Sequence, residues 1–105
     1  MIRQMERREW FIGLDPRARI AVVTSGRPIT GYAVRLEFFM DDDWVTVRLF
    51  DNAHGRHDEH AYVGDEKQPA SDFFYGPTTQ ALPTAIGLLE ERWAAIIEVW
   101  KGRQK

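Results

Sequence analysis

The fold is decided by residues 32–50, YAVRLEFFMDDDWVTVRLF, where two runs of alternating apolar and polar residues flank three aspartates. Successive side chains of a strand point to opposite faces of a sheet, so this period of two predicts two strands, each with one buried face. The apolar face of the first strand is predicted to hold Tyr32, Val34, Leu36, Phe38 and Met40. The aspartates interrupt the pattern and predict the turn of an antiparallel hairpin.

The second strand of this hairpin covers residues 44–50. Its predicted apolar face holds Val45, Val47 and Leu49, and its polar face holds Thr46, Arg48 and Phe50. Two tight-turn registers keep the apolar faces of the strands together. One opposes Arg35 to Arg48, a like-charge pair that costs stability, whereas the other opposes Glu37 to Arg48. We therefore predict the second register, which also opposes Phe38 to Val47.

Further strands are predicted on both sides of the hairpin. Residues 10–14 form a short apolar cluster that ends at an Asp-Pro turn, and residues 18–24 are rich in the β-branched side chains that favour strands. Residues 59–63 predict another short strand, with His60 and Tyr62 on the same polar face as Arg48. The next eight positions, residues 64–71, are predicted to be a solvated loop.

The C-terminal segment is predicted to be a helix, because apolar residues recur at steps of three and four from Leu82 to Trp100. Proline is tolerated only in the first turn, so Pro83 predicts a start near residues 79–82, and Gly102 predicts the end. The expected fold is α+β, an antiparallel sheet of three to five strands with one C-terminal amphipathic helix packed on its apolar face. We expect a single domain, residues 1–105, whose residues 1–8 form a loose N-terminal arm.

The composition is that of a folded domain without a strong bias in charge. Of the 105 residues, 44% are hydrophobic and 29% are charged, and the formal net charge is -2. That balance argues against a strongly basic surface for duplex nucleic acid. Cysteine is absent, which excludes disulfides and thiolate chemistry. No apolar run approaches the roughly 18 residues of a membrane span, and the N-terminus lacks a secretory signal. We therefore expect a cytoplasmic protein with no membrane contact.

Residues 51–60, DNAHGRHDEH, contain every histidine of the chain. These histidines are His54, His57 and His60. On a helix, their three-residue spacing would align three imidazoles with Asp51, a set that suits zinc or another divalent ion. However, Gly55 and the Asp51-Asn52 pair favour a turn. We therefore predict neither a metal site nor a cofactor.

The same stretch predicts an acid–base site, because imidazole titrates near neutrality. The catalytic candidates are His54, His57, His60 and Asp51. The substrate-binding candidates are Arg48 and Arg56, which suit a phosphate, and Asn52 and Tyr62, which would orient it. Metal-independent RNA cleavage needs little more, because the attacking 2′-hydroxyl belongs to the substrate. The alternative is a structural turn whose histidines are surface residues or strand caps.

The residues that carry a family resemblance are Asp51, Asn52, His54, Gly55, His57 and His60. With the flanking strands and helix they resemble a group of small, uncharacterised bacterial proteins that have a D-N-x-H-G turn followed by histidines. They also resemble the TumE-like family of toxin components, and the similarity covers about residues 32–100. The resemblance implies a toxin that acts on RNA or a nucleotide and is neutralised by a cognate antitoxin.

Two functions are therefore expected. The first is a toxin-like ribonuclease or nucleotide-acting protein that uses the histidine-rich loop and the adjacent arginines. The alternative is a non-enzymatic interaction module, accessory or antitoxin-like, which binds another protein through its exposed sheet face and the aromatic residues 73–75. A homodimer is compatible with either function.

Overall fold

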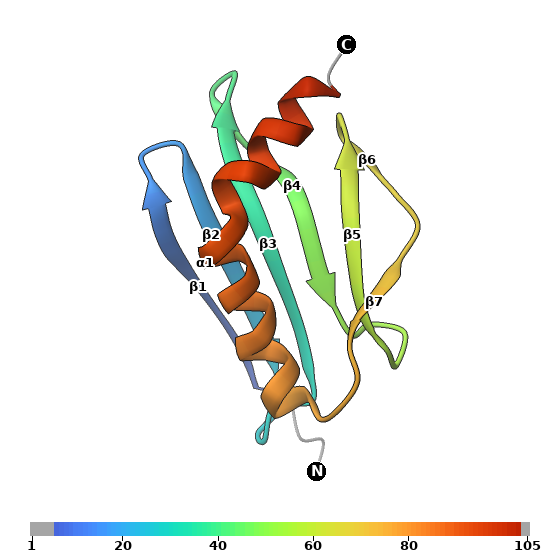
Figure 1. Ribbon diagram of the computed structural model, residues 1–105. Coiled ribbons are helices and arrows are strands. Elements are labelled where there is room, and N and C mark those ends of the chain that lie inside the picture. The colour runs from blue at the N-terminus through green and yellow to red at the C-terminus, as the bar shows by residue number, and fades with distance from the viewer. Residues whose placement is uncertain (1–5, 104–105) are drawn as a thin grey trace.

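The computed structural model describes residues 6–103, which form an antiparallel sheet covered on one face by a helix (Figure 1). The elements are β1 (Arg7–Asp15), β2 (Ala18–Ser25), β3 (Gly31–Met40), β4 (Asp43–Asp51), β5 (His57–Val63), β6 (Glu66–Lys67), β7 (Ser71–Phe74) and α1 (Thr78–Gly102). The strands pair in the order β1-β2-β3-β4-β5-β6, and β7 also pairs with β5. The predicted α+β class with one C-terminal helix is confirmed.

The predicted number of strands, three to five, is wrong, because residues 6–103 contain seven. The additional strands β6 and β7 come from residues 64–77, part of which was predicted to be a solvated loop. After Gly64 the chain turns back along β5, and the N–H of Gln68 donates to the carbonyl oxygen of Ala61 at 2.9 Å. The segment thereby pairs with backbone groups of β5 that would otherwise lie at an open edge.

The N-terminal strand begins earlier than its apolar cluster. Of the arm predicted over residues 1–8, residues 1–5 lie outside the described residues. Arg7 and Arg8 belong to β1 and oppose Ser25 and Thr24 of β2. Backbone pairing with β2 therefore extends β1 to Arg7 and Arg8, although the sequence there shows no alternation of apolar and polar residues.

The turn between β3 and β4 sets the register of the central hairpin. Asp41 and Asp42 have φ values of 52° and 63°. Two consecutive residues with positive φ make the type I′ turn that best matches the twist of a hairpin, and aspartate tolerates this conformation. The turn opposes Met40 to Asp43 and continues the register that would oppose Arg35 to Arg48. The predicted register is therefore wrong. Neither Glu37 with Arg48 nor Phe38 with Val47 is an opposed pair.

A β-bulge in β4 then removes the like-charge pair that this turn would create. The pairs on either side of the bulge are Leu36 with Arg48 and Glu37 with Thr46. Val47 is thus an extra residue on β4, and the register shifts by one beyond it. As a result Arg35 opposes Leu49 instead of Arg48.

The bulge also changes which side chains of β4 face α1. Phe50, which was predicted to lie on the polar face, is 1% exposed in the core. Its ring packs edge-to-face on Phe73 with the centroids 4.8 Å apart. Leu49, which was predicted to lie in that core, is buried on the opposite side of the sheet. We call that side the far face. It carries Arg19, Arg35, Glu37, Leu49, Asp51, Asp58 and His60.

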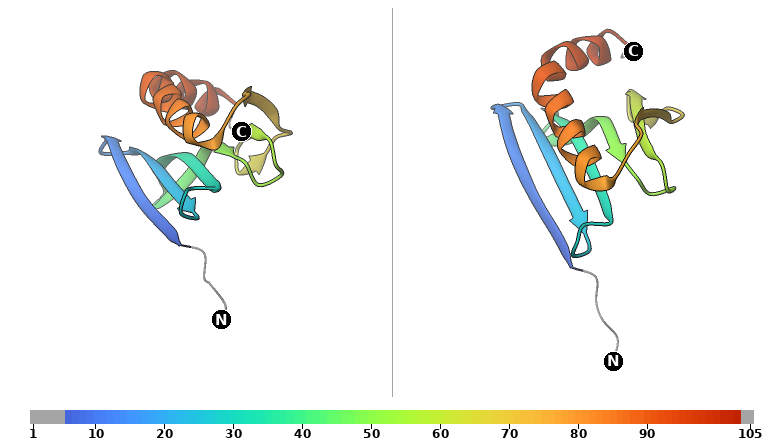
Figure 2. Two further views of the ribbon diagram at one scale, coloured as in Figure 1. Left: turned by 90° about the horizontal axis from the view of Figure 1, so that it is seen from below. Right: turned by 60° about the horizontal axis from the view of Figure 1, so that its bottom comes forward.

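The helix lies as a separate layer over the sheet (Figure 2). Its fully buried side chains begin with Ala81, Ala85 and Leu89, spaced four residues apart. Small side chains at the first two positions allow the helix backbone to approach the sheet closely. Leu82 and Ile86, which belong to the apolar residues that recur at steps of three and four, are half-buried beside them. The core therefore lies between this side of α1 and the apolar side of β2, β3 and β4.

The ends of α1 are close to those predicted. The helix starts at Thr78, which places Pro83 in the second turn, and it ends at Gly102 as expected. No helix among residues 6–103 has an apolar stretch long enough to cross a membrane.

The position of Phe50 is tested by truncating it. Phe50→Ala should lower the free energy of unfolding by about 3–5 kcal/mol, because it leaves a cavity in a packed core. Urea denaturation followed by circular dichroism measures this change. Val99→Ala removes an apolar side chain that is 53% exposed, and should change the free energy by less than about 0.5 kcal/mol. A similarly small loss for Phe50→Ala would contradict the placement.

Candidate functional site

The turn between β4 and β5, residues 52–56, contains three of the predicted site residues, Asn52, His54 and Arg56. Gly55 has a φ of 79°, and its N–H donates to the carbonyl oxygen of Asn52 at 3.1 Å. Asn52 Nδ2 donates to the carbonyl oxygen of Thr30 at 2.8 Å, and its Oδ1 accepts the N–H of Tyr32 at 3.0 Å. Asn52, predicted to orient a substrate, is thus bonded to the backbone at the start of β3. The turn itself is present as its sequence predicts.

His57 is held by contacts on both ring nitrogens. Its Nε2 lies 2.8 Å from the carbonyl oxygen of Gly76, and since a carbonyl can only accept, Nε2 carries the proton and donates. Its Nδ1 then accepts the hydroxyl proton of Tyr32 at 2.8 Å. The ring also lies between the rings of Tyr32 and Phe74, with each centroid 5.8 Å away. His57 therefore links β3 to the segment that precedes α1.

The hydroxyl of Tyr32 is unusually hard to ionise. Burial raises its pKa to about 12, and the negative charges of Asp51 and Asp58 add to this effect. Tyr32 therefore remains a neutral donor to His57 at all pH values near neutrality. This hydroxyl can therefore donate to Nδ1 of His57 throughout that range.

Arg56 and His54 lie on the exposed turn. Arg56 Nε donates to Oδ1 of Asp72 at 3.1 Å, and Asp72 also accepts the hydroxyl of Tyr75 at 3.1 Å. The hydrogen bond between them raises the pKa of Arg56 and lowers that of Asp72. Arg56, His57 and Asp72 line an open pocket of about 240 Å³. His54 is exposed and makes no hydrogen bond or ion pair within residues 6–103.

Arg48 does not share a face with His60, which corrects the prediction. The bulge at Val47 turns Arg48 to the α1 side of the sheet, where it forms an ion pair with Glu59. Its Nε is buried without a hydrogen-bond partner among the described residues. The guanidinium predicted to bind phosphate is thus matched by a carboxylate of the neighbouring strand.

His60 lies on the far face with two carboxylates. It opposes Leu49, and the adjacent opposed pair is Asp51 with Asp58. One ligand atom of His60 and one oxygen from each aspartate all lie within 4.8 Å of one another. His60 is 8% exposed and Asp58 is 5% exposed, whereas Asp51 is half-buried. The cluster is therefore closed on one side and reachable from the side of Asp51.

Tyr62 belongs to the same strand as His60. Burial raises the pKa of its hydroxyl, the charge of Arg35 opposes that rise, and the charge of Asp51 adds to it. Tyr62 thus lies within electrostatic range of the cluster.

The three imidazoles do not converge on one site. Residues 57 and 60 lie three apart on β5, so their side chains point to opposite faces of the sheet. His57 contacts Tyr32 and Phe74 on the α1 side, His60 lies with Asp51 on the far face, and His54 is exposed in the turn. Of the predicted catalytic residues, the structure brings together His60 and Asp51.

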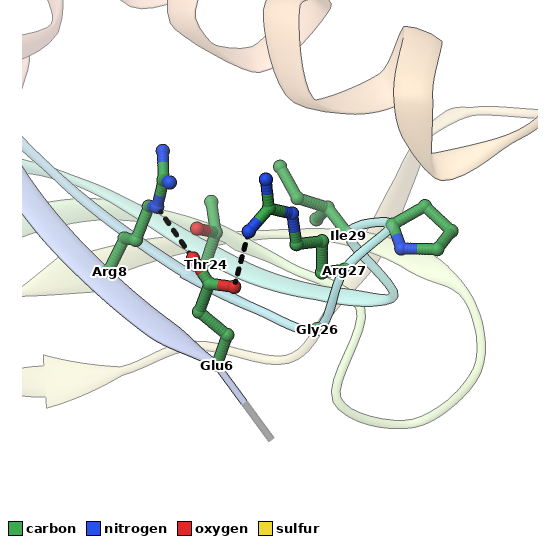
Figure 3. Close-up of a pocket in the computed structure, with 7 residues that line it drawn as sticks. Glu6, Arg8, Thr24, Gly26, Arg27 and Ile29 are labelled. Carbon is green, nitrogen blue, oxygen red and sulfur yellow. Dashed lines mark hydrogen bonds and ion pairs between the residues drawn. The ribbon is translucent and has the colours of Figure 1, made fainter. Parts of the chain in front are cut away.

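Three arginines of the N-terminal part of the chain, Arg8, Arg19 and Arg27, form ion pairs with carboxylates. Figure 3 shows Glu6 between Arg8 and Arg27 at the rim of an open pocket of about 370 Å³. The Glu6 oxygens lie 3.1 Å from Arg8 Nε and 3.6 Å from Arg27 Nη1. On the far face, Arg19 Nε lies 2.7 Å from Oε1 of Glu37. These contacts compensate the positive charge locally.

Asp58 is the site residue that the sequence analysis missed. A usable signal was present, because Asp51 and Asp58 flank a short turn between two strands. Hairpin pairing places residues at such positions opposite each other. Tyr32, Gly76 and Gln68, the partners of His57 and His60, lie farther away in sequence, and no local pattern identifies them.

The profile of one protein family, described as a domain of unknown function (DUF7718), matches residues 5–105. No curated protein and no solved structure matches the chain significantly.

The structural position of His57 is tested against that of His54. His57→Ala should lower the free energy of unfolding by about 1–3 kcal/mol, because it leaves the buried hydroxyl of Tyr32 without an acceptor. His54→Ala, in the exposed turn just before β5, should change it by less than about 0.5 kcal/mol. Thermal and urea unfolding of both variants measure the difference. Equal effects of the two substitutions would contradict the described contacts of His57.

Proposed function

Because the chain belongs to the DUF7718 family, whose description assigns no function, we propose from the geometry that it is a non-enzymatic protein-interaction module. The interaction surface is the free edge of β1, and its occupant is the β1 strand of a second copy of the chain. The observation that carries this proposal is the length and exposure of β1 at the margin of the sheet.

The β1 strand is nine residues long and pairs only with β2 among the described residues (Figure 1). Most of its residues are exposed, including Trp10 at 38% and Phe11 at 50%. A long edge strand with free N–H and C=O groups is a template for another strand. Exposed aromatic side chains on both faces of such a strand add apolar area that pairing would bury.

Two backbone hydrogen bonds identify which groups of β1 point away from the sheet. The N–H of Gly26 donates to the carbonyl oxygen of Glu6 at 2.7 Å, in register with the β1–β2 ladder. The N–H of Phe39 donates to the carbonyl oxygen of Arg17 at 2.8 Å, in register with the β2–β3 ladder. Bonded residues alternate along an antiparallel strand, so even-numbered residues of β1 bond to β2. The residues that present free groups are Arg7, Glu9, Phe11 and Gly13.

The sequence of β1 is self-complementary about Phe11. A two-fold axis there would oppose Phe11 to its own copy, and Arg7 to Asp15, so opposite charges meet at both ends. The same register opposes Trp10 to Ile12 on the α1 side. A two-fold axis at Glu9 would also use the outward-pointing backbone groups of the odd-numbered residues. However, it would oppose Glu9 to its own copy and would pair fewer residues. Phe11 therefore gives the best match.

Self-association through β1 is tested by removing one outward N–H. Phe11→Pro should weaken the dimer at least about ten-fold, because symmetry removes the bond twice at about 0.5–1.5 kcal/mol each, together with two aromatic rings. Sedimentation equilibrium over a concentration series measures the dissociation constant, with circular dichroism to check the fold.

Val99→Ala, at an exposed apolar position on α1, is the matched control and should leave the dimer unchanged. A wild-type chain that stays monomeric at all concentrations would contradict self-association, as would a Phe11→Pro variant with wild-type affinity. Capture of a different protein at β1 by a monomeric chain would identify another occupant.

The toxin-like ribonuclease, with its resemblance to TumE-like components and an RNA or antitoxin partner, stays a prediction. The feature that favours it is the pocket beside Arg56 and His57. However, both nitrogens of His57 are bonded within the chain, and Arg56 is paired with Asp72. The separated imidazoles therefore support the interaction module better than acid–base catalysis in this pocket.

A further inference from the structure

We propose that Asp51, Asp58 and His60 bind one divalent transition-metal ion of the zinc type on the far face. This site is separate from the β1 edge and does not depend on self-association. Its ligand set also differs from the His54, His57 and His60 spacing that first suggests a metal, since only His60 contributes an imidazole.

The geometry of the β4–β5 pair brings the three side chains together. Asp51 opposes Asp58, and the pair of Leu49 with His60 lies two residues along β5 on the same face. The three ligand atoms lie within 4.8 Å of one another. Zinc–ligand distances of about 2.0–2.2 Å place ligands of one tetrahedral ion about 3.4 Å apart. Rotation about side-chain bonds can bring the ligand atoms to this separation without a change in the sheet.

The hydrogen bond of His60 determines which ring nitrogen would bind the metal. Its Nδ1 lies 2.8 Å from the carbonyl oxygen of Gln68, and a carbonyl can only accept, so Nδ1 carries the proton. In the neutral ring, Nε2 then offers its lone pair to a metal. A backbone carbonyl bonded to the far nitrogen is the arrangement that fixes the tautomer and ring orientation of metal-binding histidines.

Asp58 supplies an independent indication. It is 5% exposed, and its carboxylate accepts no hydrogen bond and forms no ion pair within residues 6–103. Its oxygens are not among the fully buried unpaired atoms, but a largely buried carboxylate that no cation pairs is unfavourable. Asp58 also lies directly between two other acids of the sheet, Asp51 on β4 and Asp72 on β7. Opposed like charges destabilise a sheet, and a bound cation would reverse that effect.

Arg56 does not satisfy this need. Arg56 interacts electrostatically with Asp58, but its guanidinium is hydrogen-bonded to Asp72 at the exposed side of β7. Asp51 likewise forms no ion pair among the described residues, and the one hydrogen bond of its side chain there is accepted from the N–H of Ala53 at 3.4 Å. The carboxylates of Asp51 and Asp58 therefore have no cationic partner among the described residues, and their two negative charges would match one divalent cation.

The donor set selects the class of metal. Two carboxylate oxygens and one imidazole nitrogen suit zinc and neighbouring first-row ions, whereas calcium requires six to eight oxygen ligands. Three protein ligands leave a fourth coordination position of zinc for water or another small ligand. Because Asp51 is half-buried, that position would face solvent.

The test is isothermal titration of the purified full chain with zinc chloride. The wild type should bind one zinc ion per chain, and His60→Gln and Asp58→Asn should each weaken binding at least about ten-fold. Zinc should also raise the unfolding temperature of the wild type but not of these variants. Long-range ¹H–¹⁵N spectra should show a zinc-dependent shift of Nε2 in His60, while Nδ1 stays protonated.

His54→Gln is the matched control, because it removes an exposed imidazole from the turn between β4 and β5, and it should bind zinc as the wild type does. Calcium chloride should give no binding. If Asp58→Asn does not fold, Asp51→Asn at the half-buried position should show the same loss. Absence of stoichiometric zinc in the wild type would overturn the site. Wild-type affinity in His60→Gln would also overturn it, as would a loss of binding confined to His54→Gln.

Discussion

Val47 is an extra residue on β4, opposite the step from Leu36 to Glu37 on β3. The faces on which the later side chains of β4 lie depend on this residue. The two-residue turn at Asp41 and Asp42 sets the starting register, and Val47 shifts it by one. Without the shift, two arginines would oppose each other and Asp51 would point toward α1. With it, Phe50 completes the core, and Asp51 meets Asp58 on the far face.

Local alternation was sufficient to predict the strands over residues 32–40 and 44–50, because side-chain periodicity is a direct property of an extended backbone. It was not sufficient to predict register. Three consecutive aspartates offer more than one two-residue turn, and the geometry of the turn outweighed the charge pairing from which the register was predicted. Residues 71–74 show no clear alternation, and they form a strand because β5 offers them an edge.

The turn at residues 52–56 was correctly predicted, but residues 57–60 of the histidine-rich stretch belong to β5, and closeness in sequence did not place the imidazoles together. In a strand, residues 57 and 60 must face opposite ways, so one of them contacts Tyr32 and the other meets Asp51. Asp58 could have been found by pairing the strands across the turn. The partners of His57 and His60 come from segments around residues 68 and 76, which only the folded chain brings near. The two surfaces with unsatisfied groups, the β1 edge and the cluster on β4 and β5, lie in different parts of the sheet (Figure 1).

The bulge at Val47 is the claim on which the core and the carboxylate cluster both rest, and nuclear Overhauser contacts in the full chain test it most directly. The ring protons of Phe50 should show contacts with the ring of Phe73, and the backbone of Arg35 should show cross-strand contacts with Leu49. A spectrum in which Leu49 contacts Phe73, with Arg35 opposite Arg48, would contradict the account.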